Sequence, residues 1–97
     1  MLTAHDVDEL LAECVEELPA WVLERLGDTL IRAEAMPATW PLAPTPYRIT
    51  IYRARLLAQA ETRAELRRLA RAELLRLVVE RLELEATQAV ELVAACL

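Results

Sequence analysis

The stretch that decides the fold class is Tyr47-Arg48-Ile49-Thr50-Ile51-Tyr52. Its side chains alternate with a period of two, and it is rich in β-branched and aromatic residues, which is typical of a half-buried strand. A shorter run over residues 29–34 follows a Gly-Asp turn signal and also predicts a strand. Two strands imply a small sheet, so we expect a sheet as well as helices.

Two helices are predicted after these strands. Thr62-Arg63-Ala64-Glu65 has the sequence of a full capping box and opens a segment whose apolar residues recur at helical intervals, so the longest helix is expected over residues 62–84. A further apolar stripe runs from residue 86 to residue 97, through Ala89, Val90, Val93 and Leu97. This stripe needs a surface to cover it.

Two helices are also predicted before the strands. Thr3 and Asp6 resemble a capping box, so the first helix is expected to begin near Ala4. Pro19 suits the first turn of a second, short helix, and Gly27 is placed to end it.

In this order the elements predict an α+β fold with helices on one face of a small sheet: an N-terminal helix, a long helix in the C-terminal half and a short final helix. The chain of 97 residues is expected to form one domain, residues 1–97. Four prolines between residues 36 and 46 predict a loop between the strands, because each removes a backbone donor. An all-α bundle is the alternative.

Charge is divided between two parts of the chain. Residues 1–30 hold eight acidic side chains and one arginine, whereas residues 48–76 hold eight arginines and three glutamates. Either the two segments pack together and neutralise each other, or the basic segment meets an acidic partner. The net charge of −5 argues against nucleic acid as the main partner, since phosphate binding needs a basic surface.

Several kinds of site and location are not indicated. Cys14 and Cys96 have no CxxC spacing and no accompanying histidine cluster, so neither a zinc knuckle nor a disulfide framework is expected. The longest apolar stretches fall well short of the roughly 20 residues that a membrane span requires, and the N-terminus is acidic. We therefore expect a cytoplasmic protein that binds neither a membrane nor a cofactor.

Three segments, in their order and spacing, resemble the minimal zincin-like metallopeptidase family of small bacterial proteins. They are Glu16-Glu17-Leu18-Pro19, Arg48-Ile49-Thr50-Ile51-Tyr52-Arg53 and Thr62-Arg63-Ala64-Glu65-Leu66-Arg67-Arg68-Leu69. The resemblance implies a His-Glu-x-x-His motif on the long helix, in which the two histidines hold zinc and the glutamate acts as general base. The loop between the strands departs from the family pattern, because it is shorter and lacks a Gly-containing stretch.

At the three defined positions of that motif the chain has Arg76, Leu77 and Glu80, and Arg81 follows directly. Arg76 has no lone pair to give to a metal, Leu77 cannot accept a proton, and the one carboxylate lies beside two arginines. The resemblance therefore implies a degenerate member that has no metal site and is not a peptidase. Arg76 and Glu80 are four residues apart, so either they form an ion pair where a metal would otherwise lie, or both point to water.

Three functions are compatible with these residues. The first is a non-catalytic zincin-like domain that binds a protein partner or forms a homodimer. The second is a hydrolase with an unrecognised site, using Glu80 with Glu73 or Tyr52 in a cleft beneath the long helix. The third is a small helical interaction module, unrelated to zincins, that dimerises through residues 86–97.

Three further side chains are candidates for a binding site. Trp21 and Trp40 can line a cleft or an interaction surface, although as two of only four aromatic residues they also suit core anchors with one edge exposed. His5, the single histidine, falls in the first turn of a different helix from the motif positions and is expected to be solvated or to have a capping role.

Overall fold

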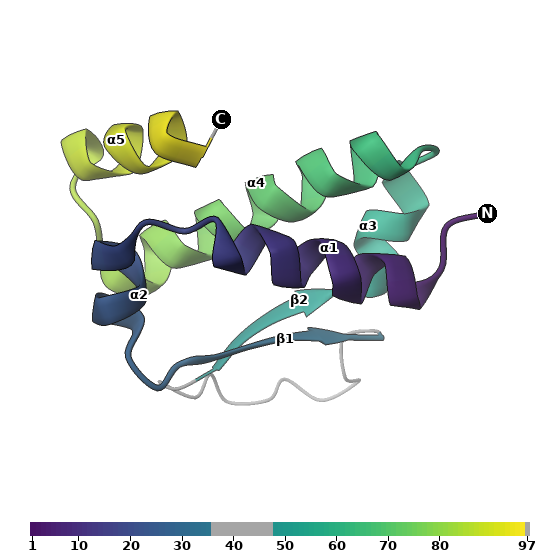
Figure 1. Ribbon diagram of the computed structural model, residues 1–97, viewed down its shortest axis with the longest axis horizontal. Helices are drawn as coiled ribbons and strands as arrows, with labels where there is room; N and C mark the ends of the chain where they lie inside the picture. The colour runs from purple at the N-terminus through teal and green to yellow at the C-terminus, as the bar shows by residue number, and fades with distance from the viewer. Residues whose placement is uncertain (36–47, 97) are drawn as a thin grey trace.

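A computed structural model describes residues 1–35 and 48–96. The elements follow in the order α1 (Ala4–Glu16), α2 (Ala20–Leu26), β1 (Leu30–Glu34), β2 (Arg48–Tyr52), α3 (Arg53–Gln59), α4 (Arg63–Leu82) and α5 (Ala86–Cys96), as Figure 1 shows. The predicted α+β class is confirmed, and the alternative of an all-α bundle is wrong because two strands pair. Within these two ranges, none of the helices combines the length and apolar character needed to cross a membrane.

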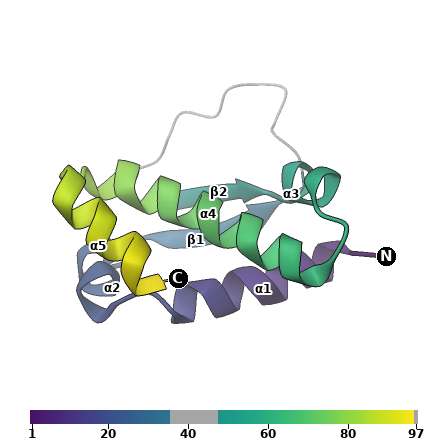
Figure 2. The same ribbon diagram turned by 90° about the horizontal axis from the view of Figure 1, so that it is seen from above.

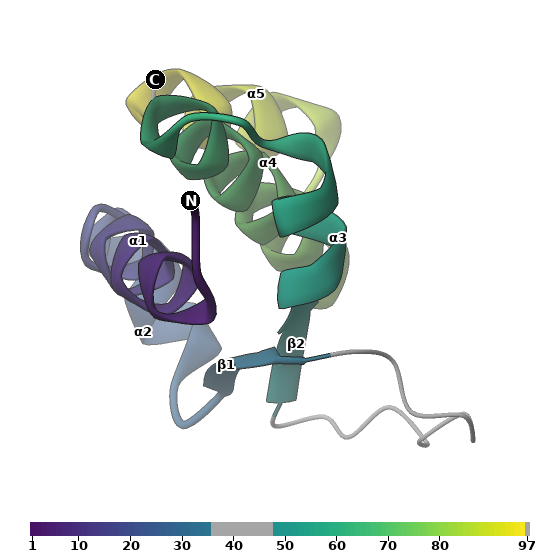
Figure 3. The ribbon, with the colours of Figure 1, turned by 90° about the vertical axis from the view of Figure 1, so that its right-hand side faces the viewer.

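The two strands form a parallel sheet. Ile31 lies opposite Ile49 and Ala33 opposite Ile51, and these side chains are buried or half-buried. Seen from the end of the molecule, α1, α3 and α4 lie on the same side of this sheet (Figure 3). The first strand begins one residue later than predicted, and Tyr47 of the second predicted strand lies outside the described residues.

α1 begins at the predicted capping box. The Thr3 N–H donates to Asp6 Oδ2 at 2.8 Å, and the Asp6 N–H donates to Thr3 Oγ1 at 3.3 Å. The hydrogen bond from the Thr3 N–H is the main reason why the pKa of Asp6 lies below its ordinary value. One face of the helix then enters the core through Val7, Leu10, Leu11 and Cys14.

α2 also has the expected ends. Pro19 precedes its first residue, and Gly27 follows its last residue with a φ of +55°, a conformation that glycine adopts without the steric cost of a Cβ atom. Val22 and Leu26 face the core from this short helix.

α4 is the longest helix, as predicted, but only half of its expected capping box is present. The Glu65 N–H donates to Thr62 Oγ1 at 3.1 Å, whereas the Glu65 carboxylate accepts from the Glu61 N–H at 3.4 Å instead of returning to the Thr62 N–H. At its other end the chain turns through Glu83, which has a φ of +51°. The Leu84 N–H donates to the Val79 carbonyl oxygen at 3.1 Å, which completes a Schellman-type end.

α3 was not predicted. It follows β2 without a loop, has no side-chain cap, and places one residue, Leu56, in the core. A helix of seven residues with one buried side chain shows no apolar periodicity, so the sequence pattern conceals it.

A row of ion pairs joins α1 to α4, and we call it the charge ladder. Arg63 lies 2.7 Å from Asp6 and 2.9 Å from Glu9, Arg67 pairs with Glu13 and Glu17, and Arg71 lies 2.9 Å from Glu17. Because the pairs advance in the same direction along both helices, α1 and α4 run parallel. The interpretation that the acidic and basic segments pack together and neutralise each other is confirmed.

α5 buries a different face from the one predicted. Leu92 is completely buried, whereas Val90 and Val93 of the predicted stripe are 68% and 39% exposed. Ala89 is half-buried, and Leu97 lies outside the described residues. Nearly every residue of α5 is apolar or small, so its pattern does not select one face, and the larger leucine occupies the core.

Candidate functional site

Arg76, at the first position of the degenerate motif, is paired with carboxylates on its own helix. Its Nη2 lies 2.6 Å from Glu73 Oε1, and its Nη1 lies 3.4 Å from Glu80 Oε2. The expected pair with Glu80 is therefore present, but Glu73 is the closer partner. The side chains of Arg76 and Glu80 are 56% and 70% exposed, so their pair contributes roughly 0.3–0.5 kcal/mol.

Leu77, at the second position of the motif, and Arg81, directly after the motif, connect α4 to the sheet. Leu77 is half-buried and packs against the core. Arg81 Nη2 donates to the Arg48 carbonyl oxygen at 2.5 Å, at the start of β2. Together with Glu80, these residues line a hollow of about 350 Å³. The contacts of Leu77 and Arg81 hold α4 against the core and the start of β2.

Tyr52 and Glu73 share a second, smaller hollow beneath α4. It has a volume of about 200 Å³ and is lined also by Gln59 of α3 and by Arg76, but not by Glu80. The structure thus places Tyr52 and Glu73 in one hollow, and Glu80 lies outside it although Arg76 pairs with both glutamates. The hydrogen bond from Arg76 lowers the pKa of Glu73, whereas a general base works best with a pKa near the operating pH.

The remaining candidates are distributed over other parts of the molecule. Trp21 is half-buried and packs against the core. Trp40 lies outside the described residues. His5 is 78% exposed on α1, where its Nε2 lies 3.0 Å from Glu9 Oε1.

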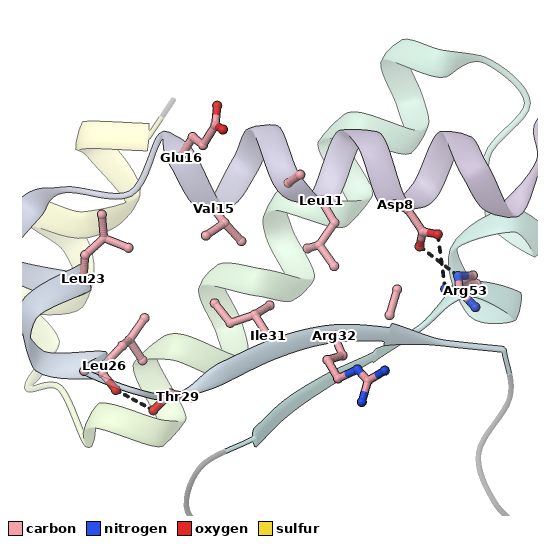
Figure 4. A pocket seen from close by; sticks show the side chains of 13 residues that line it. Asp8, Leu11, Val15, Glu16, Leu23, Leu26, Thr29, Ile31, Arg32 and Arg53 are labelled. Carbon is pink, nitrogen blue, oxygen red and sulfur yellow. Dashed lines mark hydrogen bonds and ion pairs between the residues drawn. The ribbon is translucent and has the colours of Figure 1, made fainter.

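A hollow of about 610 Å³ opens between α1, α2 and β1 (Figure 4). It was not predicted from the sequence. Its walls are mainly apolar, and Asp8 and Arg53 form an ion pair of 2.9 Å at one end. The lining comes from α1, α2, β1 and the start of α3, which are separate in the sequence, so only the folded chain brings these residues together.

A groove of about 410 Å³ lies on the opposite side of α4 from the sheet, between α4 and α5, and we call it the α4–α5 groove. Its apolar lining comes from Ala72, Leu75, Val79 and Val93, and its charged lining consists of Arg68, Arg71 and Arg76.

The three arginines of the α4–α5 groove differ in their ion pairs. Arg71 pairs with Glu17, and Arg76 pairs with Glu73 and Glu80. Arg68 makes no ion pair with any residue in the ranges 1–35 and 48–96. The groove therefore presents an apolar surface beside an uncompensated positive charge.

Comparison of the chain with models of known protein families gives no match, and neither does comparison with curated proteins. The resemblance to minimal zincin-like peptidases stays a prediction. Function must therefore be argued from the side chains of this chain and from their contacts.

Proposed function

We propose that the protein is a non-catalytic binding domain, on a zincin-like scaffold that has lost its metal site, and that it acts by contact with another protein or with itself. The observation that carries the proposal is the position of Arg76. Its guanidinium lies within ion-pair distance of the carboxylates of Glu73 and Glu80, where a zincin would need a metal ligand.

The chemistry of these side chains supports loss of the metal site. A zinc peptidase holds its ion with neutral or anionic donors and keeps one position open for a water that a carboxylate deprotonates. A guanidinium has no lone pair and keeps its positive charge, so Arg76 repels a cation from both neighbouring carboxylates. Leu77 offers no group that could accept a proton from water.

The surface on the other side of α4 supports a binding role. Val90 and Val93 are exposed on α5, and Val93 also lines the α4–α5 groove. Apolar side chains that gather beside a groove are typical of contact surfaces. An uncompensated arginine next to such a surface adds a preference for a partner that carries negative charge.

Metal analysis combined with a peptidase assay tests this proposal. Protein purified from zinc-supplemented medium is expected to hold far less than one equivalent of zinc and to cleave no peptide. The variant Arg76→His/Leu77→Glu/Glu80→His is the matched positive control, since it places the donor set on the same scaffold and is expected to gain zinc affinity.

Two outcomes would contradict the proposal. One equivalent of zinc in the unaltered protein would restore the metallopeptidase interpretation. Peptide turnover that disappears in Glu80→Gln or Glu73→Gln would instead favour a hydrolase with an unrecognised site. Both variants replace solvent-accessible carboxylates, so a loss of turnover would not be explained by unfolding.

A further inference from the structure

The exposed face of α5 is not covered by any residue in the ranges 1–35 and 48–96. On a helix of 3.6 residues per turn, Ala86, Val90, Val93 and Ala94 share one side, and Leu92 enters the core from the other. All four of the former are exposed. Figure 2 shows α5 starting beside the C-terminal end of α4 and running back towards the α1 side.

This face continues into the α4–α5 groove. Val93 belongs to both, and from it the apolar lining passes to Ala72, Leu75 and Val79 along α4. The spacing of these three residues keeps them on neighbouring turns of one helix side. The two apolar surfaces therefore form one contact area that extends from α5 to α4.

The charges of the two halves are opposite. Residues 82–96 contain three glutamates and no basic side chain, whereas the charged residues that line the groove are three arginines. Glu91 is the one acidic residue within α5, and it makes no ion pair with the described part of the chain. Arg68, on the groove side, is likewise without one. One chain thus carries both an acidic apolar helix and a basic apolar groove.

From this complementarity we propose that the α4–α5 groove is occupied by α5 of a second copy of the chain, in a two-fold dimer. Val90 and Val93 of each copy lie against Ala72 and Leu75 of the other, and Glu91 of each copy faces Arg68 of the other. This inference rests on the proposed function and names the partner of that surface.

A second copy explains the surface better than an unrelated acidic helix does. A single helix in the groove would leave the valines of α5 largely in water, whereas a two-fold contact covers the groove and the exposed face of both copies at once. Stable interfaces bury about 800 Å² on each partner, which is about an eighth of the 6571 Å² of accessible surface. Faces of two helices, one of 20 and one of 11 residues, offer an area of that order.

Light scattering and sedimentation equilibrium over a range of concentrations test the dimer. The unaltered protein is expected to dimerise. Either Arg68→Glu or Glu91→Arg places like charges in contact twice per dimer and is expected to raise the dimer Kd about tenfold. An equimolar mixture of the two variants is expected to recover dimers, because in the mixed pair each glutamate meets an arginine.

The matched control is Arg32→Glu, which reverses an exposed arginine on β1, away from the groove, and is expected to leave the dimer Kd unchanged. Val90→Asp is expected to abolish the dimer with no loss of helical circular dichroism, since Val90 lies outside the core.

A strict monomer at about 100 μM, or two charge variants that do not complement each other, would overturn the dimer. So would a monomer that binds an acidic amphipathic peptide in the groove, because that result assigns the groove to a different protein. None of these results affects the zinc measurement. Failure of the dimer and failure of the proposed function are therefore distinguishable.

Discussion

Arg67 and Arg68 are neighbours in the sequence and lie on two different sides of α4. Arg67 pairs with Glu13 and Glu17 across the closed contact with α1, whereas Arg68 lines the open α4–α5 groove without an ion pair in the part of the chain that the structure describes. On the α1 side of α4, arginine therefore takes part in ion pairs within the fold. On the groove side, it lies at an open surface. Successive side chains on a helix point about 100° apart. Neighbouring arginines in one basic segment therefore have different roles.

The largest difference in the free energy of unfolding is expected between a substitution in the core and a substitution on the open side of α4. Leu74→Ala removes a side chain that is 1% exposed and is expected to lower the free energy of unfolding by about 2–5 kcal/mol. Val93→Ala, on the open side, is expected to change it by less than about 0.5 kcal/mol at protein concentrations below the dimer Kd. Urea denaturation followed by circular dichroism measures both. Equal losses in the two variants would show that Val93 is buried in the monomer.

Replacing Arg67 or Arg68 by alanine compares the two sides of α4 at neighbouring positions. Arg67→Ala breaks two ion pairs of the charge ladder and is expected to lower the free energy of unfolding by about 1 kcal/mol, whereas Arg68→Ala is expected to change it by less than about 0.5 kcal/mol. The difference should decrease in 1 M NaCl, because salt screens exposed charges. A loss for Arg68→Ala that matches that of Arg67→Ala would contradict the assignment of Arg68 to an open surface.

A smaller change in the free energy of unfolding is expected from a substitution in the turn between α4 and α5. Glu83 has a positive φ in a position that glycine prefers, so Glu83→Gly is expected to raise the free energy of unfolding by about 0.5–1 kcal/mol. Gly27→Ala, at the end of α2, is the converse variant and is expected to lower it by about 1 kcal/mol, because Gly27 also has a positive φ. Thermal denaturation compares the two variants, and stabilisation by Gly27→Ala would contradict the observed backbone geometry.

Acid is expected to weaken the ion pairs on the closed side of α4. The hydrogen bond from Arg63 is the main cause that lowers the pKa of Glu9 below its ordinary value of 4.5. A carboxyl whose pKa is lower in the folded state stabilises the fold above its unfolded pKa and loses that contribution as the pH falls through its folded pKa. Denaturation midpoints measured between pH 6 and pH 2 are expected to fall less steeply in Arg63→Gln than in the unaltered protein. Arg68→Gln should keep the original slope, and a change in its slope would place a carboxylate beside Arg68.

The elements that the sequence predicted well are those with a strong local signal, either a side-chain cap or a clear alternation of apolar residues. The Thr3 and Thr62 caps located α1 and α4, and the alternation around Ile49 and Ile51 located β2. The prediction failed where neither signal was clear. α3 has a single buried side chain and no side-chain cap, and α5 is apolar on nearly all sides, so the buried face was assigned to the wrong residues.

The candidate site contains contacts within one helix, which local spacing predicts, and surfaces formed by several elements, which it does not predict. The pair of Arg76 with Glu80 follows from a spacing of four residues, and the sequence therefore predicted it. The closer pair with Glu73 at a spacing of three was not predicted, although both spacings place side chains together on a helix. The α4–α5 groove depends on how α5 returns over α4, and no local pattern encodes that direction.

The charge ladder joins residues that are 50 to 57 positions apart in the sequence. Residues 1–35 carry nine carboxylates and two arginines, and residues 48–97 carry nine arginines and seven carboxylates, so the two pieces have net charges of −7 and +2. No charged residue lies between them. If the backbone were cleaved there, the two fragments would attract each other and could reassemble as a split protein, more readily in dilute buffer than in concentrated salt.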